Sequence, residues 1–120
     1  MPKAIAYSSK KAKGSRLEKK FAQMLRETGL DPEAQRMVGS GAWFGFETDI
    51  KTTLPFAFEM KNQETFRMWP FWEQAERARK PFRDPVLVYS ANNRPMMVVM
   101  VAEDWLNLVK KAQDNDSGQK

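Results

Sequence analysis

The 120-residue sequence contains no cysteine and no histidine. Without cysteine, the chain has no disulfide bond of its own and no thiolate ligand for a metal ion. Without histidine, it lacks the imidazole group of the common zinc sites and of the serine–histidine–aspartate triads. A metal ion bound by its side chains must therefore be held by oxygen atoms, the ligands that Mg²⁺ and Mn²⁺ prefer.

Long apolar runs are also absent. No stretch approaches the roughly 18 residues of a membrane span, and residues 1–14 lack the apolar segment of a signal peptide. We therefore expect a cytoplasmic protein with no membrane partner and no small-molecule cofactor. Hydrophobic residues make up 42% of the chain, including eight Phe and four Trp, which is typical of a globular protein. The length predicts one domain.

Positive charge is concentrated near the N-terminus. The net charge is +5, and residues 1–20 contain one acid, Glu18. The basic residues of this segment are Lys3, Lys10, Lys11, Lys13, Arg16, Lys19 and Lys20. We predict that residues 1–13 form a flexible basic arm that binds phosphate groups of a nucleic acid. A solvated tail that aids solubility is the open alternative.

Hydrophobic periodicity predicts alternating helices and strands. We expect helices over residues 15–28, 71–79 and 102–112, and strands over 34–38, 46–50, 56–61, 86–89 and 97–101. The last two strands are expected to be buried and central, and the last helix to turn Trp105, Leu108 and Val109 inward. This order indicates an α/β or α+β domain with a mixed sheet, over residues 14–112, followed by a frayed polar tail over 113–120.

The triplet Glu59-Met60-Lys61 carries the strongest chemical signal. Residues two apart on a strand share a face, so Glu59 and Lys61 are expected side by side. Asp49 ends the preceding strand and brings a second carboxylate nearby if the two strands pair. Two carboxylates around a hard cation, with a lysine beside them, suit phosphodiester hydrolysis. A solvated, salt-bridged strand face is the alternative.

From residue 13 to residue 78 the sequence resembles the archaeal-type Holliday junction resolvases, a branch of the PD-(D/E)xK nuclease superfamily. The resemblance rests on short motifs in the family's order: Lys13-Gly14-Ser15 with Glu18, Arg36 leading to Ser40-Gly41, Asp49-Ile50, Glu59-Met60-Lys61 and Glu73-Gln74-Ala75. It implies a restriction-endonuclease-like fold, with a central mixed five-stranded sheet flanked by helices. Thr48 stands where the motif's name has proline.

The resemblance also implies roles for single residues. Asp49 and Glu59 are expected to bind Mg²⁺ or Mn²⁺, with the Met60 carbonyl and Glu18 as further ligands. Lys61 is expected to be the catalytic lysine, with Ser40 and Gln74 also in the active site. The expected DNA-binding residues are Lys10, Lys11, Lys13, Arg16, Arg36 and Ser40.

Several of these residues have simpler interpretations. Glu18 has capping-box spacing from Ser15, Ser40 lies between two turn-forming glycines, and Gln74 has the position of a helix-surface residue. Trp69, Phe71 and Trp72 are more readily core or dimer contacts than platforms for stacked bases.

The expected activity is metal-dependent cleavage of four-way DNA junctions. Because a junction has two-fold symmetry and needs paired cuts, we expect a homodimer. A related nuclease acting on flaps, single strands or duplex ends, and a non-catalytic nucleic-acid-binding module, are the alternatives.

Overall fold

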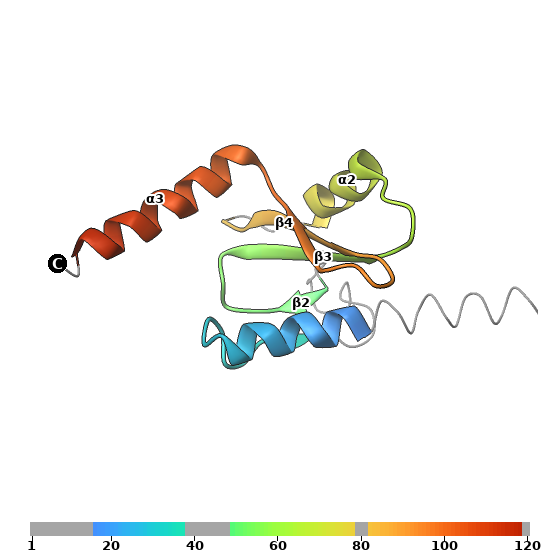
Figure 1. Ribbon diagram of the computed structural model, residues 1–120, viewed down its shortest axis with the longest axis horizontal. Coiled ribbons are helices and arrows are strands. Elements are labelled where there is room, and N and C mark those ends of the chain that lie inside the picture. The colour runs from blue at the N-terminus through green and yellow to red at the C-terminus, as the bar shows by residue number, and fades with distance from the viewer. Residues whose placement is uncertain (1–15, 38–48, 79–81, 119–120) are drawn as a thin grey trace, which may run out of the picture.

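The computed structural model describes residues 16–37, 49–78 and 82–118. Figure 1 shows a sheet with a helix on each side and a C-terminal helix that extends away from it. None of the helices in the described part has the length and apolar character that crossing a lipid bilayer requires.

The first helix covers residues 16–27 of the described chain and confirms the predicted helix at this position. Leu17, Phe21 and Leu25 recur at helical intervals and are buried, so one face of the helix packs on the sheet. Gly29 ends the helix in the left-handed region, with a φ of 79°. This conformation costs glycine little because it has no Cβ.

A three-stranded mixed sheet forms the centre of the molecule. Strand β3 (Phe56–Asn62) pairs in parallel with β4 (Asp84–Ser90), and β4 pairs antiparallel with β5 (Met97–Val99). The buried run in β4 confirms its predicted central position. In contrast, β5 lies at the edge, and its residues Met97 and Val98 are exposed. The prediction that β5 is a buried central strand was therefore wrong.

The other two strands of the described chain form a separate two-stranded sheet. Strands β1 (Gln35–Arg36) and β2 (Ile50–Lys51) pair antiparallel. The expected single five-stranded sheet is thus divided in two, although the number of strands among the described residues and the α/β class agree. A physical reason lies at the edge of β3, where the side chain of Asp49 accepts the N–H of Met60. Because a side chain occupies this donor, β2 does not continue the ladder there.

Each face of β3 packs against a different helix. Phe58 and Met60 join the core beneath the first helix, whereas Leu87, the register partner of Glu59, joins a second core beneath α2 (Met68–Ala78). Helix α2 begins three residues before the predicted start, with Pro70 in its first turn. Proline is tolerated there because the first N–H groups of a helix have no intrahelical acceptor.

Helix α3 (Ala102–Gly118) continues six residues past its predicted end. Its expected inward face is wrong for two residues, because Trp105 is 54% exposed and Leu108 is 38% exposed; Val109 is half-buried. Only Met100 and Val101 separate α3 from β5. The helix leaves the sheet at once and extends away from it (Figure 1), so its apolar side chains do not reach the core.

Two residues fix the turn between β2 and β3. The buried carboxylate of Asp31 accepts hydrogen bonds from the Thr52 hydroxyl and from the Thr53 N–H. On the other side, the guanidinium of Arg83 donates to the carbonyl oxygens of Thr52, Leu54 and Phe56. This turn is therefore held from both sides, which sets where β3 begins.

Candidate active site

Strand β3 presents Glu59 and Lys61 on one face, as their spacing predicted. The Nζ atom of Lys61 lies 3.9 Å from Oε1 of Glu59, and the two side chains are 18% and 14% exposed. This is the face that packs beneath α2, because Glu59 and Lys61 pair in register with Leu87 and Tyr89 of the second core. The pair therefore lies half-covered between the sheet and a helix, unlike a fully solvated strand face.

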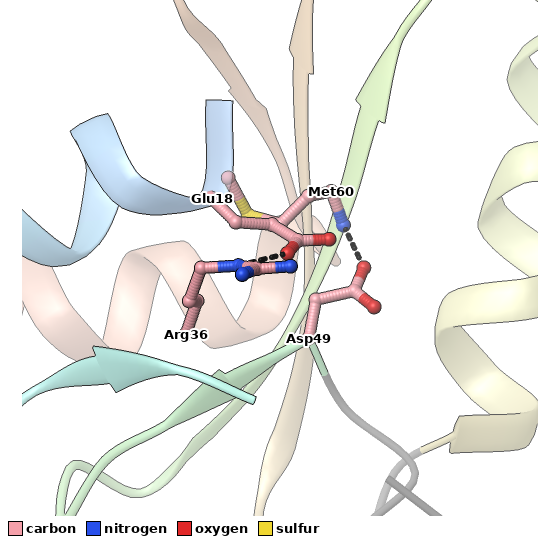
Figure 2. A network of polar contacts seen from close by, with 4 residues as sticks. All are labelled: Glu18, Arg36, Asp49 and Met60. Atoms are coloured by element: carbon pink, nitrogen blue, oxygen red, sulfur yellow. Dashed lines mark hydrogen bonds and ion pairs between the residues drawn. The ribbon is translucent and has the colours of Figure 1, made fainter. Parts of the chain in front are cut away.

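Asp49 reaches the open edge of β3 from the residue before β2. Its backbone N–H donates to the Phe58 carbonyl at 3.2 Å, and its carboxylate accepts the Met60 N–H at 2.8 Å, as Figure 2 shows. The N–H and C=O of one residue point to the same side of a strand. The Met60 carbonyl thus faces the same edge as the Asp49 carboxylate.

Glu18 approaches this edge from the first helix, on the opposite side of the sheet from Glu59. Its carboxylate accepts a hydrogen bond from Nε of Arg36 in β1, at 3.1 Å. Figure 2 shows the carboxylates of Glu18 and Asp49 on the same side of the β3 edge, close to Met60. Acidic side chains from three elements, Glu18, Asp49 and Glu59, therefore lie near the same stretch of β3, around Met60.

Burial, and after it the charge of Asp49, raises the proton affinity of Glu59 and of Glu18. Burial raises the pKa of Glu59 to about 7, and the negative charges of Asp49 and Glu18 add to this effect while Lys61 opposes it. The pKa of Asp49 is raised by burial, against the Met60 N–H and Lys61. For Glu18, burial and then Asp49 raise the pKa, against Arg36. The three groups thus form one electrostatically coupled cluster.

This cluster has the chemistry of a site for a hard divalent cation. Carboxylate and carbonyl oxygens are the ligands of Mg²⁺ and Mn²⁺, and Mg²⁺ commonly takes only one or two carboxylates and keeps several waters. A cation at this edge would offset the burial that raises the pKa of Glu59 and of Asp49, and also the repulsion that Asp49 and Glu18 exert on Glu59. Among the described residues, no group of three or more acidic side chains lies close enough to hold one ion. The arrangement fits two carboxylates, Asp49 and Glu59, more closely than three.

The remaining predicted site residues differ in their surroundings. Gln74 is half-buried at the margin of the buried face of α2. Arg16 is exposed on the first helix, and Arg36 is paired with Glu18. Ser40 and the capping residue Ser15 lie outside the described residues, as do Lys10, Lys11 and Lys13.

Aromatic residues beside Lys61 were not assigned to the site from the sequence. The Lys61 ammonium lies 5.5 Å from the centroid of the Phe71 ring. Phe71 in turn contacts Phe66, whose ring is 4.6 Å from that of Tyr89. Phe71 and Trp72 are buried, which confirms their assignment to the core, whereas Trp69 is 65% exposed. Phe71 and Ala75 are four residues apart and lie on the buried face of α2, which packs on the face of β3 that carries Glu59 and Lys61. Only this helical spacing could have indicated the contact between Phe71 and Lys61.

An acidic pair and a lysine on an α/β scaffold, at the edge of a strand that carries Glu-x-Lys, have the arrangement expected of an active site of the PD-(D/E)xK nuclease class. The comparison with protein families agrees. The family model described as "Phage putative PDDEXK endonuclease" matches residues 9–118, a range that includes Glu18, Asp49, Glu59 and Lys61. The chain therefore belongs to this endonuclease family. No curated protein and no solved structure matched the chain.

Proposed function

We propose that the protein is a structure-selective endonuclease that cleaves four-way DNA junctions by Mg²⁺-dependent phosphodiester hydrolysis. Membership of a PD-(D/E)xK endonuclease family supports the reaction class. The similarity to archaeal-type junction resolvases in residues 13–78 supports the substrate. The observation that carries the proposal is the position of Asp49, whose carboxylate lies at the edge of β3 beside the Glu59–Lys61 pair.

Each group of the cluster has a chemical task in this proposal. Asp49, Glu59 and the Met60 carbonyl are the proposed ligands, and Glu18 approaches the ion directly or through water. When bound, a divalent cation lowers the pKa of its water and offsets charge on the scissile phosphate. Lys61 donates a hydrogen bond that orients the attacking water or stabilises the developing charge. Gln74 and Ser40 are the proposed additional active-site residues.

DNA binding is expected to depend mainly on phosphate contacts. Lys10, Lys11, Lys13 and Ser40 are proposed to contact the backbone together with Arg16 and Arg36. For Arg36, this requires the guanidinium to serve both Glu18 and a phosphate, which its five donors permit. Phosphate contacts position DNA without reading its sequence, and binding weakens as salt concentration rises. We expect the enzyme to act as a homodimer in the cytoplasm.

The test is cleavage of synthetic four-way junction, flap, single-stranded and duplex DNA, with Mg²⁺ and with chelator. Symmetric cuts in junctions alone support the proposal. Equal cutting of flaps or single strands would identify a related nuclease instead. The family description leaves this alternative open, because it names an endonuclease without a substrate. DNA binding without cleavage of any substrate would contradict the enzyme assignment and support a binding module.

A further inference from the structure

Helix α3 exposes large apolar side chains along its length. Trp105 is 54% exposed and Leu106 is 57% exposed, on a helix of 17 residues that extends from the sheet (Figure 1). Most helices in proteins gain their stability by packing an apolar face rather than from helix propensity alone. Within the described residues, the exposed face of α3 lacks such a contact.

An apolar groove lies on the face of the sheet that the first helix covers only in part. Its volume is about 290 Å³. The first helix contributes Met24, β3 contributes Phe56, and β5 contributes Val98. Every residue that lines it is apolar except Thr28. Met24 and Val98 are 42% and 55% exposed, so the described chain leaves the groove open to an apolar partner.

The chain's own α3 is badly placed to fill this groove. Leu108 of α3 lines the groove, but Trp105 and Leu106 do not. The connection from β5 has only two residues, and the Trp105 N–H already donates to the Val101 carbonyl as part of the first helical turn. Folding α3 back over the groove would require this turn to unwind.

We propose that α3 of a second copy of this chain docks in the groove, and that the two copies exchange their α3 helices about a two-fold axis. Each chain offers one uncovered helix and one uncovered groove, so reciprocal exchange satisfies both and closes the assembly at two copies. Charge also favours the contact. The first helix has four basic and two acidic residues, whereas residues 102–115 of α3 have three acidic and two basic residues.

Sedimentation velocity of the full chain provides the first test. Wild type is expected at twice the chain mass of 13.9 kDa. Trp105→Glu and Met24→Glu each place a charge in the proposed contact and are expected to raise the dimer dissociation constant at least about 100-fold. The matched controls, Asn107→Glu on the opposite side of α3 from Trp105 and Gln23→Glu beside Met24, are expected to remain dimeric. Circular dichroism checks that all four variants are folded.

Disulfide crosslinking distinguishes the possible occupants, because the chain has no cysteine of its own. An equimolar mixture of Met24→Cys with Leu106→Cys, or with Trp105→Cys, is expected to form covalent dimers under mild oxidation, whereas Met24→Cys mixed with Asn107→Cys, on the opposite side of α3 from Trp105, is not. If the mixtures stay uncrosslinked while the Met24→Cys/Leu106→Cys double variant closes within one chain, α3 covers its own groove and the proposal is wrong. A monomeric wild type without crosslinks also overturns it.

These outcomes are independent of the nuclease assignment. The mass and crosslinking measurements report assembly without DNA or metal. A dimer that cuts no DNA would leave the α3 exchange intact and refute the proposed function. A monomer that cuts four-way junctions would refute the α3 exchange and leave the proposed reaction and substrate intact.

Discussion

The edge of β3 and helix α3 differ in whether their side chains have partners among the described residues. At the β3 edge, Asp49 is bonded to Met60 and Phe58, and Glu18 is bonded to Arg36. Along α3, Trp105 and Leu106 are exposed. The described chain thus preorganises its polar cluster by itself, whereas large apolar side chains of its C-terminal helix stay exposed. If a second copy covers α3, as proposed, chemistry and assembly are separable in this molecule.

The largest expected effect is the loss of DNA cleavage when residues at the β3 edge are replaced. We expect Asp49→Asn, Glu59→Gln and Lys61→Met each to reduce the cleavage rate at least about 1,000-fold, because each removes a ligand charge or the donor beside the scissile phosphate. Single-turnover assays on labelled DNA measure this, with Glu73→Gln on the exposed side of α2 as the control. A Lys61→Met enzyme as fast as wild type would remove the lysine from the mechanism.

If the β3 edge and α3 act independently, the Asp49, Glu59 and Lys61 variants keep the mass of wild type in solution. Trp105→Glu likewise keeps the metal affinity of wild type. Loss of assembly in Glu59→Gln would show that the two regions are coupled. Sedimentation velocity and Mn²⁺ titration measure the two properties on the same preparations.

The second prediction concerns pH and stability without metal. The pKa of Glu59 is about 7 in the folded chain, against an ordinary value of 4.5 for a glutamate side chain, so the folded state binds an extra proton between these values. Stability from this group is complete below pH 4.5 and is lost as pH rises through 7. The difference corresponds to on the order of 1–3 kcal/mol.

Urea denaturation in chelator at pH 5 and pH 8 tests this shift. The pH-dependent decrease in the free energy of unfolding should be smaller in Glu59→Gln than in wild type. The Glu73→Gln protein should keep the wild-type decrease. An unchanged pH dependence in Glu59→Gln would mean that Glu59 ionises without cost in the folded chain.

A third, smaller effect concerns the support of the site. Replacing Arg83 by Met removes its hydrogen bonds to the carbonyls of Thr52, Leu54 and Phe56. We expect a loss of about 2 kcal/mol in the free energy of unfolding. Arg94→Met, at an exposed position after β4, is the control. Equal stability of the two variants would show that the turn does not depend on Arg83.

The smallest expected effect concerns Phe82, which belongs neither to the β3 edge nor to α3. Phe82 has a φ of 68° and is 99% exposed, a backbone conformation that costs a bulky residue about 1–2 kcal/mol. Phe82→Gly should therefore raise the free energy of unfolding by up to about 1 kcal/mol, since glycine loses part of this gain in entropy. A thermal melt that shows destabilisation would mean that the ring makes a stabilising contact.

Local pattern predicted the parts of the site that lie within one element. The alternation along β3 predicted that Glu59 and Lys61 share a face. The helical spacing of Leu17, Phe21, Met24 and Leu25 predicted the first helix, although Met24 is 42% exposed while the other three are buried. Contacts between distant segments could not be predicted in this way. The bond from Met60 to Asp49, the pairing of Glu18 with Arg36, and the anchoring of the turn by Arg83 depend on how three elements meet, which periodicity does not specify.

The errors have the same origin. An apolar stripe on α3 predicts burial but not what buries it, so Trp105 and Leu108 were placed inside a single chain. A run of apolar residues in β5 predicts a strand but not its place in the sheet. Five strands are present among the described residues, although β2 shares only Ile50 with the strand predicted over 46–50, most of which lies outside the described residues. The side chain of Asp49 took the edge position that would have joined these strands into one sheet.

Binding of Mn²⁺ measures most directly whether Asp49 and Glu59 form a metal site. Isothermal titration of wild type, Asp49→Asn, Glu59→Gln and Glu73→Gln, at pH 8 and without DNA, compares the site with a matched acidic control. We expect one binding event in wild type and Glu73→Gln, and at least about a tenfold weaker event in the Asp49 and Glu59 variants. Equal affinity in all four proteins would contradict a metal site at the edge of β3.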